Sequence, residues 1–166
     1  MREEMQSQIE AKRAELQAKL GNIRDERKKQ AVERIYEATN KLNERMTDHF
    51  TNVLDQIDEM LDRVESRTSK AEANGLDVST VTPEITNAQN AIALARAAVA
   101  TQAAKVYAVQ TTGNEATLRS EVGTTRQALH HDLTVVRDTV KAARDAVRKA
   151  AVALAQIPRV DENENE

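Results

Sequence analysis

The sequence contains no cysteine and no tryptophan, and only one phenylalanine and two tyrosines among its 166 residues. Without cysteine the chain has no disulfide, no thiolate metal ligand and no cysteine nucleophile. So few aromatic side chains predict a thin, aliphatic core. Four glycines and two prolines leave room for few turns. No apolar run reaches the length of about eighteen residues that a membrane span needs, so we expect no membrane span.

The residues that are present favour long helices. Apolar residues make up 40% of the chain and charged residues 31%, and Ala, Glu, Lys, Arg and Gln are abundant. This composition is typical of coiled coils and helical bundles. The net charge of −3 mixes both signs, so the composition predicts no nucleic-acid partner and no binding to an anionic membrane surface.

The chain is organised around residues 32–71. The larger apolar residues there recur at steps of three, four and seven, which is the spacing of one face of a helix. Helix of this length makes a rod of roughly 60 Å that needs other helices to cover its apolar face. The apolar residues are Val32, Ile35, Tyr36, Leu42, Met46, Phe50, Val53, Ile57, Met60, Leu61 and Val64.

Residues 1–31 read as a charged helical arm with a sparse apolar stripe. The dipeptide Gly21-Asn22 is its weak point, because glycine costs about 1 kcal/mol inside a helix. Asn22 and Asp25 also have side chains that cap new helices. We expect one continuous helix through Gly21 into the next segment, with a real break as the alternative.

Two further helices are expected after the long one. Asn74-Gly75 is a good helix stop, since glycine adopts the left-handed conformation without strain, and Pro83 suits a first helical turn. The second helix is expected over residues 80–110; it is rich in alanine, so its outer face is either solvated or buried. A turn at residues 111–114 leads to the third helix over residues 115–156.

Together these elements predict an all-α fold: an antiparallel three-helix coiled-coil-like bundle with a long N-terminal helix that overhangs. The predicted organisation is an arm over residues 1–31, a bundle over residues 32–157 and a disordered acidic tail over residues 158–166. Acidic residues of the first long helix, between Asp48 and Glu65, are expected to face basic residues of the third, between Arg126 and Lys149.

The unequal helix lengths predict an exposed end. The second helix is too short to cover residues 1–43, which leaves the apolar side chains of Val32, Ile35, Tyr36 and Leu42 bare. We therefore predict self-association into a homodimer through residues 1–43, with these four side chains as the contact residues.

No pattern in the sequence predicts catalysis, a cofactor or a small-molecule ligand. His130-His131-Asp132 resembles a metal site, but adjacent residues on a helix point about 100° apart, so a solvated pair is the better interpretation. The acidic residues from Asp48 to Glu65 have the helical spacing of a solvated or ion-paired flank. The basic run from Arg24 to Lys29 is interleaved with carboxylates and lacks aromatic partners.

Several segments carry a resemblance to known sequences. They are the run from Ile9 to Leu20, Glu33-Arg34-Ile35, Leu54 to Ile57, Leu61 to Arg67 and Ala73 to Ser79. The chain resembles small uncharacterised helical proteins encoded by candidate-phyla bacteria with reduced genomes, which usually begin with a signal peptide. The resemblance implies export and supplies no activity.

The leading hypothesis is a non-catalytic helical structural or protein-interaction module of the cell envelope. The alternatives are a periplasmic holdase-like chaperone that uses the exposed apolar end, a metal-dependent bundle enzyme using His130 and His131, and an intracellular coiled-coil adaptor. The first thirty residues hold no signal-peptide core, so we expect a periplasmic or extracellular protein if a leader was removed and a cytoplasmic one otherwise.

Overall fold

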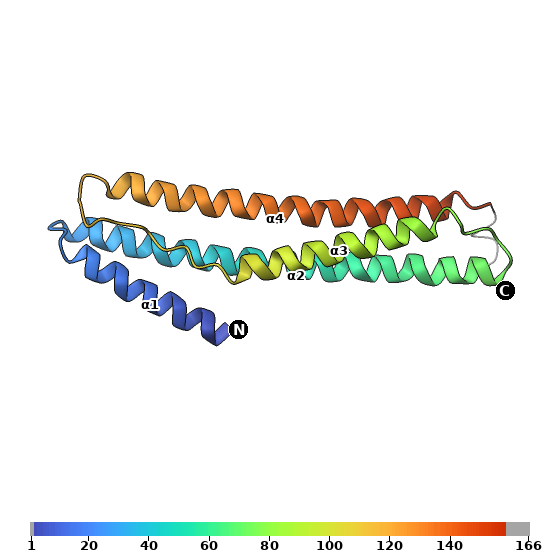
Figure 1. The fold of residues 1–166 in the computed structure, drawn as a ribbon, viewed down its shortest axis with the longest axis horizontal. Coiled ribbons are helices and arrows are strands. Elements are labelled where there is room, and N and C mark those ends of the chain that lie inside the picture. Colours follow the sequence, from blue (N-terminus) through green and yellow to red (C-terminus); the bar gives the residue numbers. More distant parts are fainter. Residues whose placement is uncertain (1, 159–166) are drawn as a thin grey trace. The chain divides into compact units, whose positions relative to one another are not determined.

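The computed structural model describes residues 2–158, which form four helices and no strand. The helices are α1 (Arg2–Leu20), α2 (Glu26–Ala73), α3 (Thr82–Ala103) and α4 (Leu118–Ala155) (Figure 1). The prediction of an all-α helical bundle is confirmed. The proposed acidic tail, after Pro158, lies outside the described residues.

The chain divides into two compact units, each built from segments far apart in sequence. Unit 1 comprises Met1–Asp48 and Ala100–Val135, and unit 2 comprises His49–Val99 and Val136–Glu166. Helices α2 and α4 contribute residues to both units, whereas α1 belongs to unit 1 and α3 falls almost entirely in unit 2. This division differs from the predicted one, which placed an arm over residues 1–31 beside a single bundle.

The expected continuous helix through Gly21 is wrong, because α1 ends at Leu20 and α2 begins at Glu26. The side chain of Asp25 caps the new helix: its Oδ1 accepts hydrogen bonds from the backbone N–H of Arg27 at 2.9 Å and of Lys28 at 3.3 Å. The local cap, together with the low helix propensity of glycine, therefore outweighs the continuity of charge and apolar spacing across the break.

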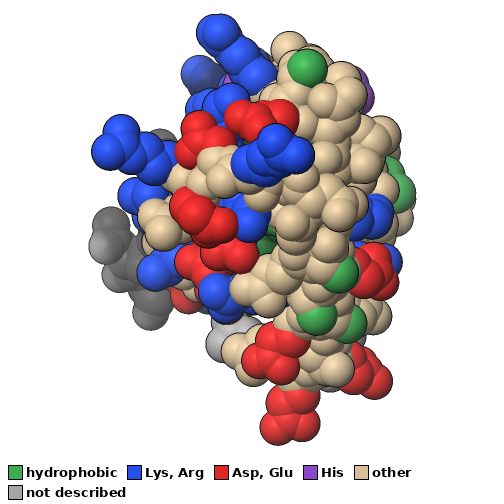
Figure 2. All heavy atoms as spheres, turned by 90° about the vertical axis from the view of Figure 1, so that its left-hand side faces the viewer, with side chains coloured by type: hydrophobic (Ala, Val, Ile, Leu, Met, Phe, Trp, Pro, Cys, Tyr) green, Lys and Arg blue, Asp and Glu red, His purple; other side chains and the backbone are tan. Residues whose placement is uncertain are grey.

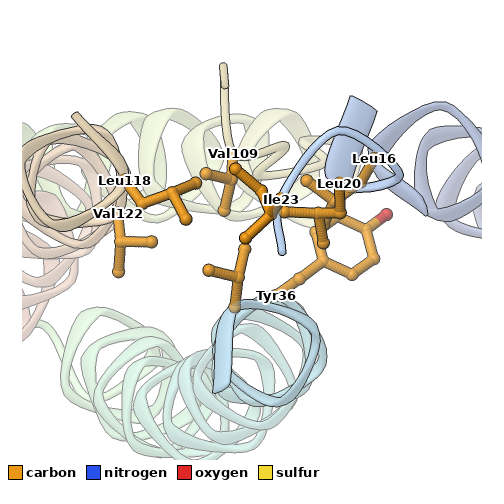
Figure 3. Close-up of a cluster of buried hydrophobic side chains, with 8 residues drawn as sticks. Leu16, Leu20, Ile23, Tyr36, Val109, Leu118 and Val122 are labelled. Atoms are coloured by element: carbon orange, nitrogen blue, oxygen red, sulfur yellow. The ribbon is translucent and has the colours of Figure 1, made fainter. Parts of the chain in front are cut away.

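The break lets α1 fold back along α2, so residues 1–43 do not overhang as predicted. Val32 is 5% exposed and Tyr36 only 1% exposed, both covered by the same chain. Tyr36 donates its hydroxyl hydrogen bond to the carbonyl of Ile9 at 2.7 Å. The buried side chains converge from α1, α2, the turn between them, the segment between α3 and α4, and the start of α4 (Figure 3). They are Leu16, Leu20, Ile23, Val32, Tyr36, Val109, Leu118 and Val122.

The second predicted helix also ends earlier than expected, at Ala103 rather than near residue 110. Residues 104–117, here called the strap, run in a largely extended form antiparallel to α2 toward the start of α4 (Figure 1). Val106, Tyr107 and Val109 prefer extended backbone, because branched and aromatic side chains lose rotamer freedom in a helix. Tyr107 and Val109 are buried, so the strap is part of the core of unit 1.

In unit 2 the predicted helix stop at Gly75 is observed. Gly75 has a φ of 79°, Gly75 N–H bonds to the carbonyl of Glu72 at 2.9 Å, and Leu76 N–H bonds to that of Ala71 at 3.0 Å. This is the Schellman pattern, and Leu76 packs against the buried cluster beside it. That cluster consists of Val64, Ala71, Val78, Val81, Ala150, Leu154 and Ile157.

The sequence predicted that the acidic flank of α2 faces α4, but two of its carboxylates pair with α3. Arg96 of α3 bonds to Asp55 and to Asp58, each at 2.9 Å. The outer face of α3 is open to solvent, and Leu94 there is 70% exposed. In unit 2, the pairs made by the single arginine of α3 therefore set its alignment with α2. The rest of this alanine-rich, almost uncharged helix does not specify that alignment.

Candidate functional site

Unit 1 contains a buried polar network that joins α2 to the strap. The amide of Asn40 pairs with the backbone of Tyr107: its Oδ1 accepts from Tyr107 N–H at 2.8 Å, and its Nδ2 donates to Tyr107 C=O at 3.2 Å. This two-bond pairing imitates that of a neighbouring strand. It satisfies backbone groups of an extended segment that has no strand beside it.

Asn43, one helical turn further along α2, caps the end of α3. Its Nδ2 donates to the carbonyls of Gln102 at 3.1 Å and of Lys105 at 3.2 Å. Gln102 returns a bond from Nε2 to Asn43 Oδ1 at 2.8 Å and donates a second to the Tyr107 hydroxyl at 2.7 Å. These bonds fix the point at which helix α3 gives way to the strap.

The network ends at Asp132 on α4. The Tyr107 hydroxyl donates to Asp132 Oδ2 at 2.6 Å, and Lys105 Nζ lies 2.8 Å from the same oxygen. Bonds from Lys105 and then Tyr107 lower the pKa of Asp132 below its ordinary value. Burial, reinforced by the bond to Asp132, raises the pKa of Tyr107. The carboxylate is therefore ionised and the phenol protonated at neutral pH, as a structural bond between α4 and the strap requires.

No direct signal for this network is visible in the sequence. Asn40 and Asn43 lie on the buried face of a helix, where asparagine is uncommon, and that was the one available clue. The structure also separates the predicted cluster His130-His131-Asp132: both histidines are exposed, while Asp132 belongs to the network. Within residues 2–158, no group of three or more His, Asp or Glu side chains is arranged to hold a metal ion.

A second hydrogen-bond cluster lies at the start of α4, around Glu121. Its Oε1 accepts from Thr112 N–H and Thr112 Oγ1, each at 3.2 Å, and from Thr117 Oγ1 at 2.9 Å. Burial alone would raise the pKa of Glu121, but the hydrogen bonds from the threonines outweigh it and lower the pKa. This carboxylate anchors the end of the strap to α4.

Charged side chains of both signs meet at the turn end of unit 1. The basic run from Arg24 to Lys29 is partly neutralised here. Lys28 pairs with Glu115, and Lys29 Nζ lies 2.7 Å from Glu26 Oε1. The bond to Glu115 raises the pKa of Lys28. Figure 2 shows Lys and Arg side chains next to Asp and Glu side chains over one part of this end, not a field of one sign.

Unit 1 has a groove between α2 and α4, with a volume of about 1020 Å³. Ile35, Ala38 and Leu42 line it from α2, and Leu129 and Leu133 from α4. Leu42 is 38% exposed and Leu129 is buried, so the apolar floor of the core continues out to solvent here.

Two small residues explain why the groove is hollow. Ala38 on α2 and Gly123 on α4 both line it and offer almost no side-chain volume. A Cβ atom placed on Gly123 would meet nothing within 4 Å. From Gly123 to Thr134 the groove follows twelve residues of helix, whose ends lie about 16 Å apart along the axis, or roughly three helical turns.

The four predicted contact residues therefore divide into two pairs. Val32 and Tyr36 are buried in the core of unit 1, so they are not the bare side chains that the sequence analysis expected. Ile35 and Leu42 line the groove. The seven-residue spacing places Ile35 and Leu42 on one face of α2. It did not predict that Leu129 and Leu133 of α4 would line a groove with them.

No family model, curated protein or solved structure matches this chain. Among the helices of residues 2–158, none combines the length and the apolar character needed to cross a membrane.

Proposed function

We propose that this protein is a non-catalytic helical module that binds another protein through the groove between α2 and α4 of unit 1. The groove supports this proposal because it exposes a continuous apolar floor, from Leu129 to the partly exposed Leu42, between two helices. Apolar grooves between helices are the usual docking sites for amphipathic helices of partner proteins.

The polar groups of unit 1 fit a scaffold better than a reaction centre. The side chains of Asn40, Asn43, Gln102 and Tyr107 use their hydrogen bonds to hold backbone or one another in place. Their role is to fix the strap against α2, which keeps the two walls of the groove in register.

Site-specific photo-crosslinking tests this function. A benzophenone amino acid placed at Leu42, in the groove, should give a discrete crosslinked band in extract of the native cells. The same group at Glu10, which is exposed on α1 and lies outside the groove, is the matched control. Equal labelling at the two positions, or none at Leu42, would contradict the proposal.

Location in the cell envelope is part of the proposal and rests on the resemblance to exported helical proteins. Fractionation of native cells with an antibody against the chain should place it outside the cytoplasm. Recovery in the cytoplasm would instead favour the intracellular adaptor.

Two other roles predicted from the sequence remain proposals. A holdase-like chaperone would suppress the aggregation of unfolded clients at stoichiometric ratios, which a specific docking module does not. Self-association through residues 1–43 would now depend on Ile35 and Leu42, because Val32 and Tyr36 are buried. Sedimentation at micromolar concentration reports it directly.

A further inference from the structure

The one formally charged side chain that lines the groove is positive. Arg126, His130 and His131 line it, and no Asp or Glu is among its lining residues in the described part of the chain. All three side chains are exposed. Within residues 2–158 no carboxylate lies within ion-pair distance of Arg126, so its charge at the rim is uncompensated.

Nearby carboxylates are engaged elsewhere. Asp132 bonds to Lys105 and Tyr107 on the strap side of α4. On α2, Glu37 pairs with Arg13 of α1 at 2.7 Å. The apolar floor of the groove is therefore bordered by the guanidinium of Arg126, with which no carboxylate of the described residues pairs.

We propose that the groove binds a short amphipathic helix of a partner protein whose carboxylates face Arg126 and His130. Its apolar side chains would enter between Leu42 on α2 and Leu133 on α4. The length of the groove, about 16 Å, limits the bound segment to roughly three turns. This inference rests on the proposed function and specifies the chemistry of the partner.

Charge complementarity selects this occupant over a second copy of the chain. A symmetric pairing of two grooves places the Arg126 of both copies in one interface whose groove-lining residues supply no carboxylate to pair with either. An acidic helix instead gains a charge-assisted contact with Arg126 beside the apolar contacts. The expected binding is consequently weakened by salt.

The test uses the full chain and two labelled synthetic peptides of about four turns. Both carry leucine at helical spacing; one has glutamate and the other lysine at the flanking positions. Fluorescence anisotropy at low and at physiological ionic strength should give binding of the glutamate peptide at least tenfold tighter than that of the lysine peptide. The preference should shrink as salt rises.

Three variants locate the site. Gly123→Leu fills the groove and should weaken the glutamate peptide at least tenfold; it should still fold, because space is open there and leucine favours helix. Arg126→Glu lies on an exposed position and should remove the preference for glutamate. Arg144→Glu, an equal charge change on α4 in unit 2, should stay within about twofold of the parent.

The proposal is overturned if the two peptides bind equally, if neither binds, or if Gly123→Leu has no effect. It is also overturned if sedimentation shows a dimer that Gly123→Leu dissociates, because the occupant is then a second copy. Crosslinking at Leu42 is independent of the partner's charge. Specific labelling there with no peptide preference would therefore leave the proposed function standing and remove only this inference.

Discussion

Replacement of Asn40 by alanine tests whether the strap depends on a side chain of α2. Asn40 and Tyr107 are both buried, at 7% exposure each. The substitution leaves the N–H and C=O of Tyr107 without partners. A buried polar group that loses its partner costs about 1–3 kcal/mol. Because water will reach part of the cavity, we expect the free energy of unfolding of unit 1 to fall by about 2–4 kcal/mol.

The two tyrosines make this measurable in one unit. Tyr36 and Tyr107 both belong to unit 1, and the chain has no tryptophan. Tyrosine emission during urea unfolding therefore reports unit 1, while far-ultraviolet circular dichroism reports all helices. Asn52→Ala is the matched control: Asn52 is exposed on the same helix, and surface substitutions change stability by only about 0.5 kcal/mol.

Asn40→Asp adds a second, pH-dependent test at the same site. Asp keeps an acceptor for Tyr107 N–H, but its other oxygen faces the carbonyls of Tyr107 and Tyr36, to which Asn40 now donates. The folded state then disfavours the ionised carboxylate, so its pKa rises. We expect this variant to be less stable than Asn40→Ala at pH 7. Its free energy of unfolding should approach that of the parent as the pH falls.

Amide hydrogen exchange gives the sharpest readout. In the parent, the Tyr107 amide should be protected because Asn40 Oδ1 accepts its hydrogen bond. In Asn40→Ala the protection of that amide should be lost, while amides in the middle of α2 stay protected. If Asn40→Ala costs less than about 0.5 kcal/mol, or if Tyr107 exchange is unchanged, then the strap is held by apolar packing alone and our reasoning is refuted.

Three further predictions concern the turns and the network. Gly75→Ala and Gly113→Ala both place alanine at a φ near 78°, which costs about 1–2 kcal/mol. A Cβ on Gly113 also lies 2.9 Å from the carbonyl oxygen of Lys19, so Gly113→Ala should cost about 1–3 kcal/mol more. If urea unfolding shows that both variants lose the same free energy of unfolding, α1 does not pack closely on the strap. Asp25→Ala removes the cap of α2 and should lower the stability of unit 1 by about 1 kcal/mol by tyrosine emission, and no change would mean that the break needs no cap. Asp132→Asn should destabilise unit 1 at neutral pH. Because the pKa of Asp132 is lowered in the folded state, the stability that its charge contributes is present above the unfolded pKa of about 3.9. The difference in free energy of unfolding between the parent and Asp132→Asn should therefore shrink below about pH 4 and not widen.

The sequence predicted the all-helical bundle because its long helices have a clear apolar periodicity. The core face of α2 and its stop at Gly75 follow from spacing and from one residue that tolerates a positive φ. The third predicted helix, over residues 115–156, matches α4 to within a few residues. These features are local, so a sequence is enough to predict them.

The errors arose where a local preference met a partner distant in sequence. The sequence at Gly21 is compatible with a weakened helix or with a break. The break is stabilised by the cap from Asp25 and by the burial of Ile23 against the strap. Alanine at positions 103 and 104 favours more helix, yet α3 ends there, because Asn43 caps its last carbonyls. Neither outcome is visible in a window of neighbouring residues.

The groove itself follows from how unit 1 covers α2. An extended segment covers a stripe about 5 Å wide, whereas a helix with its side chains covers about 10 Å. The strap is therefore too narrow to bury the apolar residues of α2 alone, and α1 must fold back over Val32 and Tyr36 to complete the core. Since α1 and the strap take one flank of α2, the other flank keeps Ile35 and Leu42 beside α4, and no further element of residues 2–158 covers them. The break at Gly21, which removes the predicted overhang, thus leaves the exposed apolar surface between two helices, where an incoming helix has two walls to contact.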